Sequence, residues 1–187
     1  HLVTHGSQRL LVDCGLFQGH KVLRLRNWAE LPFDAADIQS VLLTHAHDDH
    51  LGGLSSVQFG TVGVHHADME ALHSVDGLMA LYGVPERDWP AMTTLVTERF
   101  NYVGWPNAVG LDDGYVIDLG DVSVTLIHAP GHTAGHSVYL IESEGGRVLV
   151  TGDIDLSSFG PYYGDACSSL ADFRRSLARL PEVPAKV

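Results

Sequence analysis

Cysteine is scarce in this chain of 187 residues, which contains two, Cys14 and Cys167. Two thiols are too few for a disulfide framework or a thiolate zinc site, so the fold does not depend on an oxidising compartment. Long apolar runs are also missing: no stretch approaches the roughly 18 residues that a membrane span requires, and no charged-then-apolar leader opens the chain. We therefore expect a cytoplasmic protein with no membrane partner.

Basic residues are few as well. Lys and Arg total 11 against 23 Asp and Glu, which gives a formal net charge of −12. This charge repels phosphate backbones at long range, so we expect no nucleic acid partner. Histidine, in contrast, is abundant with 12 residues, and because imidazole is the commonest metal ligand this excess points toward a metal site.

The remaining composition is that of one folded domain. Hydrophobic residues make up 45% and charged residues 18% of the chain, which is far from the composition of disordered proteins. The length fits one domain of roughly 150 residues, and no repeat or Pro/Ser-rich linker divides it. We expect a single domain over residues 1–187.

Short β-branched runs bounded by Gly, Pro or Asp predict strands, and runs of helical composition separate them. The predicted strands are Arg9–Asp13, Ser40–Thr44, Thr61–His65, Val122–His128, Ser137–Ile141 and Arg147–Thr151. The predicted helices are Leu51–Gln58, Ala67–Tyr82, Pro85–Phe100 and a last helix capped by Ser169, in which Leu170, Phe173, Leu177 and Leu180 recur at helical spacing. This mixture predicts an α/β fold with sheets covered by helices.

The segment Thr44–His50, with the sequence THAHDDH, carries the strongest chemical signal. In an extended turn His45 and His47 point to one side, so two neutral imidazoles can hold one ion, while Asp49 and His50 face a neighbouring position. The alternative is a solvated polar loop that caps a helix. Three histidines and an aspartate so close together favour metal binding, because imidazoles clustered without a cation repel one another when protonated.

Two later segments can complete such a site. Ala129–His136, with the sequence APGHTAGH, is a tight turn between two predicted strands. His132 can project from it to complete a three-imidazole set, an arrangement typical of catalytic zinc. Val150–Asp153 ends an apolar strand in a carboxylate, and Asp153 could bridge two cations with its two oxygens, although an aspartate that caps a turn is the alternative.

Together these segments resemble the metallo-β-lactamase superfamily, with its HxHxDH motif, its GHTxGH loop and its strand-terminal GD. The resemblance spans most of the chain. Leu11–Gly15 is similar to the family's early strand ending in an Asp-x-Gly turn, and Gly114–Leu119 with Val122–Ile127 is similar to the hairpin before the third ligand. The resemblance implies a four-layer αββα sandwich of two mixed β-sheets flanked by helices, with the site along one edge.

The resemblance also implies a ligand set and a cofactor, zinc, with two ions bound and iron or manganese as alternatives. The implied ligands are His45, His47 and His132 for one metal, Asp49 and His50 for a second, and Asp153 as the bridge between them. Members with two metals usually add a late histidine after the bridging aspartate, but no histidine follows His136 here. We expect that a C-terminal segment carrying it is missing; an incomplete second site is the alternative, so the number of ions stays open.

Such a pair of cations predicts hydrolysis. Two ions about 3.5–4 Å apart share a water, lower its pKa toward about 7 and hold the hydroxide against a carbonyl or phosphoryl centre. Asp49 is the predicted catalytic residue, which orients the water and receives its proton. Serine catalysis is disfavoured because the chain has no Gly-x-Ser-x-Gly elbow, and Cys14 and Cys167 are expected to be packing residues.

Several other residues keep two interpretations. His136 and Tyr162 are candidates for substrate binding, but His136 could equally support the site through a hydrogen bond, and loop packing is favoured for the aromatics of Ser157–Gly164. Asp48 is expected to face solvent or cap the next helix. The apolar segment Leu81–Gly104 is interpreted as core packing, with a lid or a homodimer contact as alternatives. Six histidines are expected to stay outside the metal set: His5, His20, His65, His66, His73 and His128.

The sequence therefore predicts a metal-dependent hydrolase that uses a metal-bound hydroxide to cleave an ester, thioester, lactone or amide bond of a small-molecule substrate. The alternative is an iron-dependent oxidoreductase that oxidises persulfides or reduces dioxygen, because imidazole and carboxylate suit several first-row metals. A nuclease is disfavoured by the net charge of −12.

Overall fold

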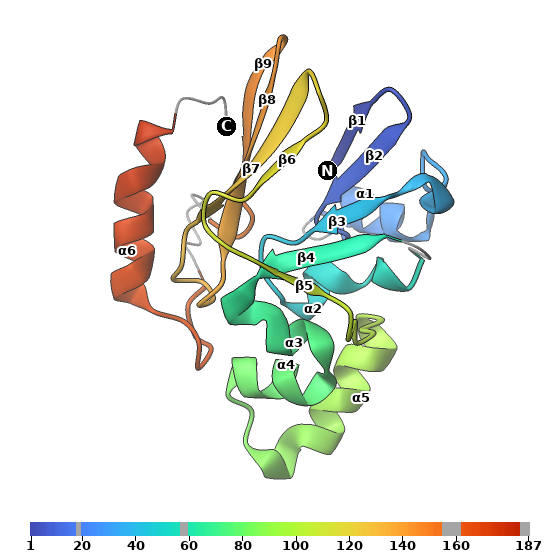
Figure 1. Ribbon diagram of the computed structural model, residues 1–187. Helices are drawn as coiled ribbons and strands as arrows, with labels where there is room; N and C mark the ends of the chain where they lie inside the picture. Colours follow the sequence, from blue (N-terminus) through green and yellow to red (C-terminus); the bar gives the residue numbers. More distant parts are fainter. Residues whose placement is uncertain (18–19, 57–59, 155–161, 184–187) are drawn as a thin grey trace.

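Two β-sheets face each other in the computed structural model, which describes residues 1–17, 20–56, 60–154 and 162–183 (Figure 1). The first sheet has the order β1 (Leu2–His5), β2 (Gln8–Val12), β3 (Ser40–Leu42), β4 (Thr61–His65), β5 (Val109–Leu111). The second has the order β6 (Val116–Asp118), β7 (Val122–His128), β8 (Ser137–Ser143), β9 (Gly146–Val150). The first sheet is mixed, because β1 pairs antiparallel with β2 and the next three pairings are parallel, whereas the described strands of the second are antiparallel throughout.

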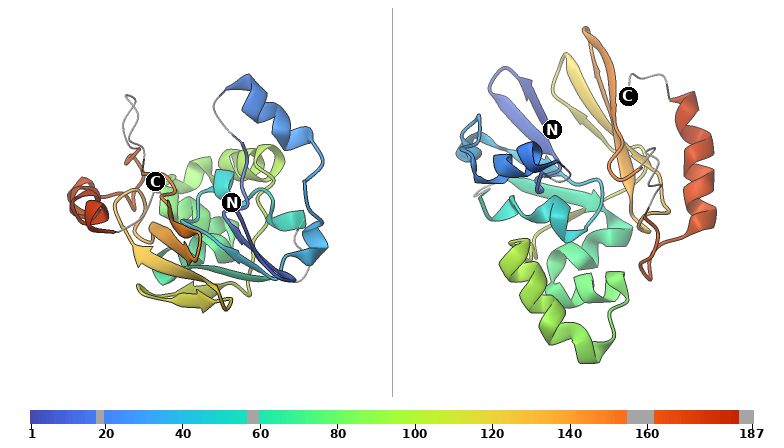
Figure 2. Two further views of the ribbon diagram at one scale, coloured as in Figure 1. Left: turned by 90° about the horizontal axis from the view of Figure 1, so that it is seen from above. Right: turned by 180° about the vertical axis from the view of Figure 1, so that it is seen from behind.

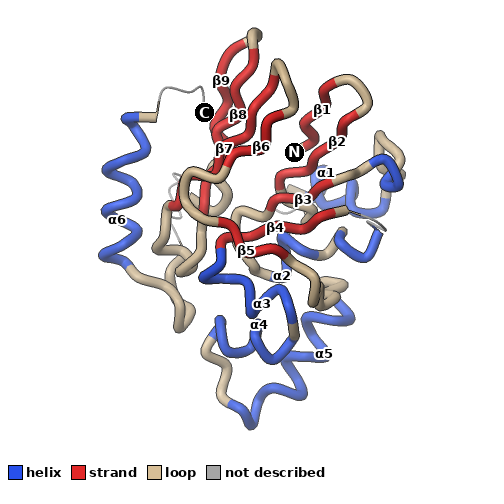
Figure 3. Tube along the Cα trace, viewed as in Figure 1, coloured by secondary structure: helices blue, strands red, loops and turns tan. Residues whose placement is uncertain are grey.

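Helices cover both outer faces of this pair of sheets, as the tube and the two turned views show (Figures 2 and 3). The helices are α1 (Lys21–Arg24), α2 (Asp48–Leu51), α3 (Met69–His73), α4 (Val75–Tyr82), α5 (Trp89–Arg99) and α6 (Leu170–Arg179). Single 3₁₀ turns occur at Leu25–Trp28, Ala35–Asp37, Leu54–Ser56, His66–Asp68, Glu86–Asp88 and Leu180–Glu182. None of the described helices combines the length and the apolar character needed to cross a bilayer.

Alternation along the strands produces three apolar layers. Successive side chains of a strand point to opposite faces, so Val41 packs toward the helices while its neighbour Leu42 packs between the sheets. In the same way Tyr139 of β8 faces the first sheet and Leu140 faces α6. Because each sheet buries both faces, the four layers form one continuous structure.

The predicted strands are confirmed to within two residues at their ends, but the predicted helices need correction. The helix predicted over Leu51–Gln58 starts earlier, at Asp48, and ends at Leu51. Gly53 follows, and its N–H donates to the carbonyl of Cys14 at 2.7 Å while a Cβ there would lie 2.4 Å from the same oxygen. This close approach of two backbones replaces the continued helix.

The last helix begins as predicted and packs differently. Ser169 caps it, since its Oγ accepts a hydrogen bond from the N–H of Asp172 at 3.2 Å. Leu170, predicted on the apolar face, is exposed, whereas Ser176 is buried and donates its Oγ–H to the carbonyl of Pro130 at 2.8 Å. The polar Ser176 thereby ties α6 to the loop between β7 and β8.

A pair of stacked histidines, neither of them a predicted metal ligand, links the two sheets. His65 ends β4 and His128 ends β7, and their rings lie 3.8 Å apart with an angle of 6° between their planes. Nδ1 of His65 accepts the N–H of Ala67 at 3.3 Å. Burial, with His128 and then His66 adding to it, lowers the pKa of His65 to about 4.

This lowered pKa predicts a loss of stability in mild acid. The unfolded chain binds a proton at this ring near pH 6.5 and the folded chain near pH 4, so stability falls as the pH drops through that window, by up to about 3 kcal/mol. Urea unfolding at pH 7 and pH 4.5 tests this for the wild type and for His65→Asn, which keeps a cap acceptor but does not titrate. The wild type should lose more stability than the variant; equal losses would contradict the prediction.

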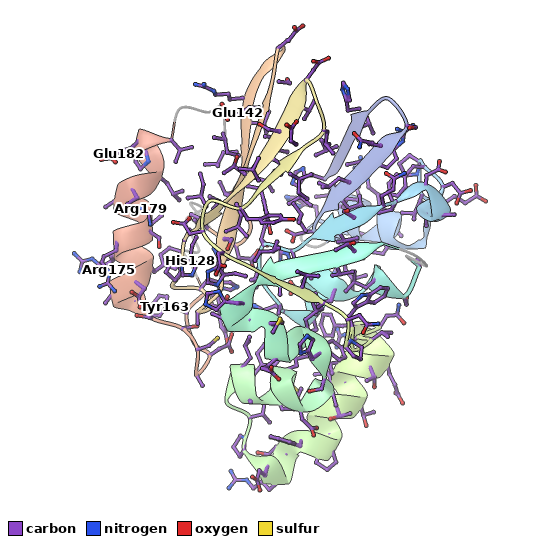
Figure 4. All side chains as sticks on the ribbon, in the orientation of Figure 1. His128, Glu142, Tyr163, Arg175, Arg179 and Glu182 are labelled. Atoms are coloured by element: carbon purple, nitrogen blue, oxygen red, sulfur yellow. The ribbon has the colours of Figure 1, made fainter. Side chains whose placement is uncertain are left out.

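A pocket of about 370 Å³ lies between α6 and β7, and His128, Arg179 and Glu182 are among its lining residues (Figure 4). In the described part of the chain this pocket shares no lining residue with the predicted metal ligands. The fold therefore separates it from the edge where the chemistry is expected.

Candidate metal centre

The predicted ligands all follow strand ends at one edge of the sandwich. Residues 44–50 follow β3 of the first sheet, while residues 129–136 join β7 to β8 and Asp153 follows β9 in the second sheet. The packing of the two sheets thus brings together His45 and His132, which are 87 positions apart in the sequence.

Three imidazole nitrogens meet at one point of this edge. Nε2 of His132 lies 3.1 Å from Nε2 of His45 and 3.0 Å from Nδ1 of His47. All three side chains are buried, and their nitrogens form a group close enough to share one ion. The structure therefore brings together the three histidines proposed for the first metal.

Hydrogen bonds on the far side of two rings indicate which nitrogen carries the proton. The Oγ–H of Thr44 donates to the carboxylate of Asp13 at 3.0 Å, so Thr44 Oγ accepts from Nδ1 of His45, 3.1 Å away. Nδ1 of His132 donates to the carbonyl of Tyr162 at 2.8 Å. In the neutral form of both rings Nε2 then lacks a proton and directs its lone pair to the shared point.

An aspartate holds the third ring. Nε2 of His47 lies 3.1 Å from Oδ2 of Asp165, and both side chains are nearly inaccessible. Neither atom has a hydrogen bond of good geometry within the described residues, so the contact is electrostatic; it favours a proton on Nε2 and leaves Nδ1 bare. Three converging lone pairs repel one another, and a cation removes that repulsion. The donor set therefore fits a divalent metal.

Burial keeps two of these rings in the form that binds a metal. It lowers the pKa of His45 well below its ordinary value, and the neighbouring His50 adds to the effect. Burial and then the charge of His47 also lower the pKa of His132. Both imidazoles are thus neutral at neutral pH.

A second position lies beside the first. Nε2 of His50 lies 3.0 Å from Oδ1 of Asp153, while Oδ2 of the same carboxylate lies 3.5 Å from Nε2 of His132. Asp153 thus directs one oxygen toward each position, as a bridging ligand must. Oδ2 of Asp49 lies 3.9 Å from Nε2 of His50, at the rim of the second position. A second group of potential ligand atoms comes from His45, His50 and Asp153.

Asp13 supports this second position, a role that the sequence did not predict. Its Oδ2 lies 3.1 Å from Nδ1 of His50, and its Oδ1 accepts the N–H of Thr44 at 2.8 Å. Burial works to lower the pKa of His50, but the hydrogen bonds and charges of Asp13 and Asp153 outweigh it and raise this pKa well above its ordinary value. Burial alone would raise the pKa of Asp153, but the hydrogen bond and the charge of His50 outweigh burial and lower this pKa to about 2.

His136 is fully buried and has a partner at each ring nitrogen. Its Nε2 accepts the N–H of Asp153 at 3.2 Å, so its Nδ1 donates to the carbonyl of Ala129 at 3.1 Å. Gly152 packs against the ring with φ +55°, and a Cβ there would lie 2.8 Å from Nε2. This geometry favours the supporting interpretation of His136 over contact with a substrate.

Asp48 corrects one expectation, because it does not face solvent. Its Oδ1 accepts the Oη–H of Tyr82 at 2.8 Å and the N–H of Asp49 at 3.0 Å. The ring of Tyr82 also stacks on His47, with 5.2 Å between ring centroids. Tyr82 ends α4, so the helical segment whose role the sequence left open supplies part of the wall around the metal centre.

Neither cysteine competes as a nucleophile. Burial raises the pKa of Cys14 and of Cys167 to about 11, so both are thiols at neutral pH. Both pack against the core between the first sheet and the helices, as expected for packing residues.

A pocket of about 550 Å³ opens beside the metal centre and includes His47 and Asp49 in its lining. Tyr162, a predicted substrate contact, also lines it and is half exposed. The earlier part of the Ser157–Gly164 stretch, residues 157–161, lies outside the described residues.

The contact between Asp165 and His47 predicts a specific effect on metal affinity. Asp165→Asn removes the negative charge behind Nε2 of His47, and we expect metal affinity to fall by about 10- to 100-fold, as for other carboxylates that orient ligating histidines. Competition with a chromophoric chelator measures this. Asp112→Asn is the matched control, because Asp112 also contacts a histidine, His66, but is exposed. Equal affinities of the two variants would contradict the prediction.

Comparison with known proteins places this site in a family. The model of the metallo-beta-lactamase superfamily matches residues 1–186. The chain belongs to the metallo-beta-lactamase superfamily. Human acyl-coenzyme A thioesterase MBLAC2 is 33% identical over 207 residues, and the match covers 97% of this chain but 66% of MBLAC2. Ribonuclease TTHA0252 of Thermus thermophilus is 30% identical over 159 residues, with coverage of 82% of this chain and 34% of the ribonuclease.

A solved structure supports the same assignment. The metallo-beta-lactamase family protein TTHA1429 from Thermus thermophilus superposes with a TM-score of 0.68 and 29% sequence identity, covering 98% of this chain and 64% of that chain. The predicted αββα sandwich is thereby confirmed. This metallo-beta-lactamase family chain spans about two thirds of the length of the thioesterase and of TTHA1429.

Proposed function

We propose that this metallo-beta-lactamase family member is a metal-dependent hydrolase that cleaves an ester, thioester, lactone or amide bond of a small molecule. The observation that carries the proposal is the convergence of three buried imidazoles, from His45, His47 and His132, on one point. The carboxylate of Asp153 reaches from this point to His50. Such a set of donors has little value for packing and fits catalytic metal binding.

The chain's own residues divide the work in this proposal. Bound divalent cations, zinc ions in the first instance, would supply an activated water and would polarise the scissile carbonyl. The three converging histidines would hold one ion, and His50, Asp49 and Asp153 would hold the other. Asp49, which lines both the pocket and the rim of the second position, orients the attacking water and receives its proton.

Acyl substrates fit this site better than polynucleotides. The similarity to the thioesterase MBLAC2 extends over 97% of the chain, which supports a carbonyl substrate. The similarity to a ribonuclease keeps phosphodiester cleavage as the alternative. The net charge of −12 and the aspartates around the pocket oppose a polyanion.

Metal analysis combined with a substrate panel tests the proposal. Protein purified without added metal is reconstituted with zinc, manganese or iron, and turnover is measured on acyl thioesters, lactones and a phosphodiester. We expect zinc uptake and hydrolysis of acyl substrates. Stoichiometric iron with a visible absorption band and dioxygen consumption would favour the oxidoreductase alternative, and cleavage of the phosphodiester alone would favour the nuclease. A protein that takes up no metal would overturn the proposal.

A further inference from the structure

The pocket beside the metal centre has one apolar wall. Met92 and Leu95 lie one helical turn apart on α5, and Phe100 follows the same helix. Val84, between α4 and α5, completes this wall. Leu95 is 38% exposed, so part of its apolar side chain is open to a ligand in the pocket. The wall is continuous with the metal centre, because His47 and Asp49 line the same pocket.

The charges around this pocket are of one sign. Asp48, Asp49 and Asp165 line it, and none of its described lining residues is Lys or Arg. Beyond the metal centre, a carboxylate or phosphate placed against the apolar wall would lose its hydration and find no basic partner. This part of the pocket therefore selects an uncharged occupant.

We propose that this pocket binds the apolar, uncharged acyl chain of the substrate, with the chain along Met92, Leu95 and Phe100 and its carbonyl at the His47–Asp49 end. This inference rests on the proposed hydrolase function and narrows it to esters, thioesters or lactones of aliphatic acids. The volume of about 550 Å³ is in the range of small-molecule sites. A charged leaving group would lie outside this pocket.

Binding can be tested without turnover by methyl NMR. The chain has three methionines, and of these Met92 lines the pocket while Met79 is fully buried in the core. Protein labelled at the methionine methyl groups is titrated with 1-butanol, 1-hexanol and 1-octanol. The Met92 methyl signal should shift saturably, and the Met79 signal should not move. Affinity should rise about two- to fourfold per added methylene. A fixed Met92 signal, or equal shifts of Met92 and Met79, would overturn the proposal.

Kinetics on the metal-loaded protein supply the second test. Across p-nitrophenyl acetate, butyrate, hexanoate and octanoate, kcat/KM should rise about two- to fourfold per methylene. An ester of octanoate length that ends in a carboxylate should be at least about tenfold poorer than octanoate, because its carboxylate would lose its hydration against the apolar wall. A rise with the carboxylate-ended ester, or no dependence on chain length, would refute the acyl pocket.

Two variants test whether the dependence on chain length comes from the apolar wall of the pocket. Leu95→Asp should reduce the octanoate-to-acetate ratio of kcat/KM toward one and abolish the Met92 shift. Leu170→Asp changes another exposed leucine, on α6, that lines neither pocket, and it should leave the ratio as in the wild type. Equal ratios for both variants would refute the assignment. Turnover of acetate without dependence on chain length would refute the acyl pocket but not the hydrolase function. Binding of the alcohols at Met92 without turnover of any ester would refute the hydrolase function but not the apolar binding site.

Discussion

Replacing His132 with alanine is expected to remove one metal ion per chain and to lower kcat/KM by on the order of a thousandfold or more, because water activation depends on the bound cation. His132 is the ring on which the site converges: its Nε2 is within 3.1 Å of ring nitrogens from both His45 and His47, and it lies 3.5 Å from the proposed bridging carboxylate of Asp153. Metal content by mass spectrometry and turnover of an acyl ester measure the two effects.

The fold should tolerate this change. The backbone carbonyl of His132, which accepts the Oγ–H of Ser168 at 2.7 Å, is kept in the alanine variant. His128→Ala is the control, since this histidine precedes the same loop and bonds to the carbonyl of Ala134 rather than to the metal set. We expect wild-type metal content and turnover there. A His132→Ala protein that retains its metal and its activity would show that the chemistry lies elsewhere.

The fold was predictable where a local pattern decides the structure. Alternating or short β-branched runs located the main strands, and the cap at Ser169 located the start of α6. The short strands β1 and β5 were missed, because Leu2–His5 and Val109–Leu111 form strands only through pairing with neighbours. The break between α3 and α4 at Ser74 was also missed. At Ser74 the backbone takes an extended conformation, and the Oγ of Ser74 caps the next helix.

The part of the site that lies in short sequence motifs was predictable from the sequence. His45, His47 and His132 could be named because their spacing has a chemical meaning in one short segment or one turn. Asp13, Asp68 and Asp165 could not, since each acts across the fold on a residue far away in the sequence. A single aspartate in a loop has many uses, so only the folded geometry distinguishes these supports from surface residues.

Asp68→Ala is expected to destabilise the protein strongly, even without metal. Asp68 is 1% exposed and accepts three hydrogen bonds: from Thr133 Oγ at 2.6 Å, from the N–H of Gly135 at 2.7 Å and from the N–H of Ala46 at 3.3 Å. One carboxylate thereby joins the histidine turn after β3 to the loop that carries His132. Alanine leaves these donors buried without an acceptor, which costs about 3–5 kcal/mol in total.

Two control variants accompany this prediction: asparagine at position 68, and alanine at an exposed aspartate. Asp68→Asn keeps one acceptor oxygen but turns an N–H₂ toward another donor, so it should lose roughly half as much stability as alanine. Asp118→Ala also removes an acceptor of a backbone N–H, that of Gly120, but at the surface, and should stay within about 0.5 kcal/mol of the wild type. Urea unfolding in the presence of a chelator separates this effect from metal binding. If Asp68→Ala were as stable as Asp118→Ala, the two loops would be held together by packing alone, and the preorganisation of the three imidazoles would need another cause.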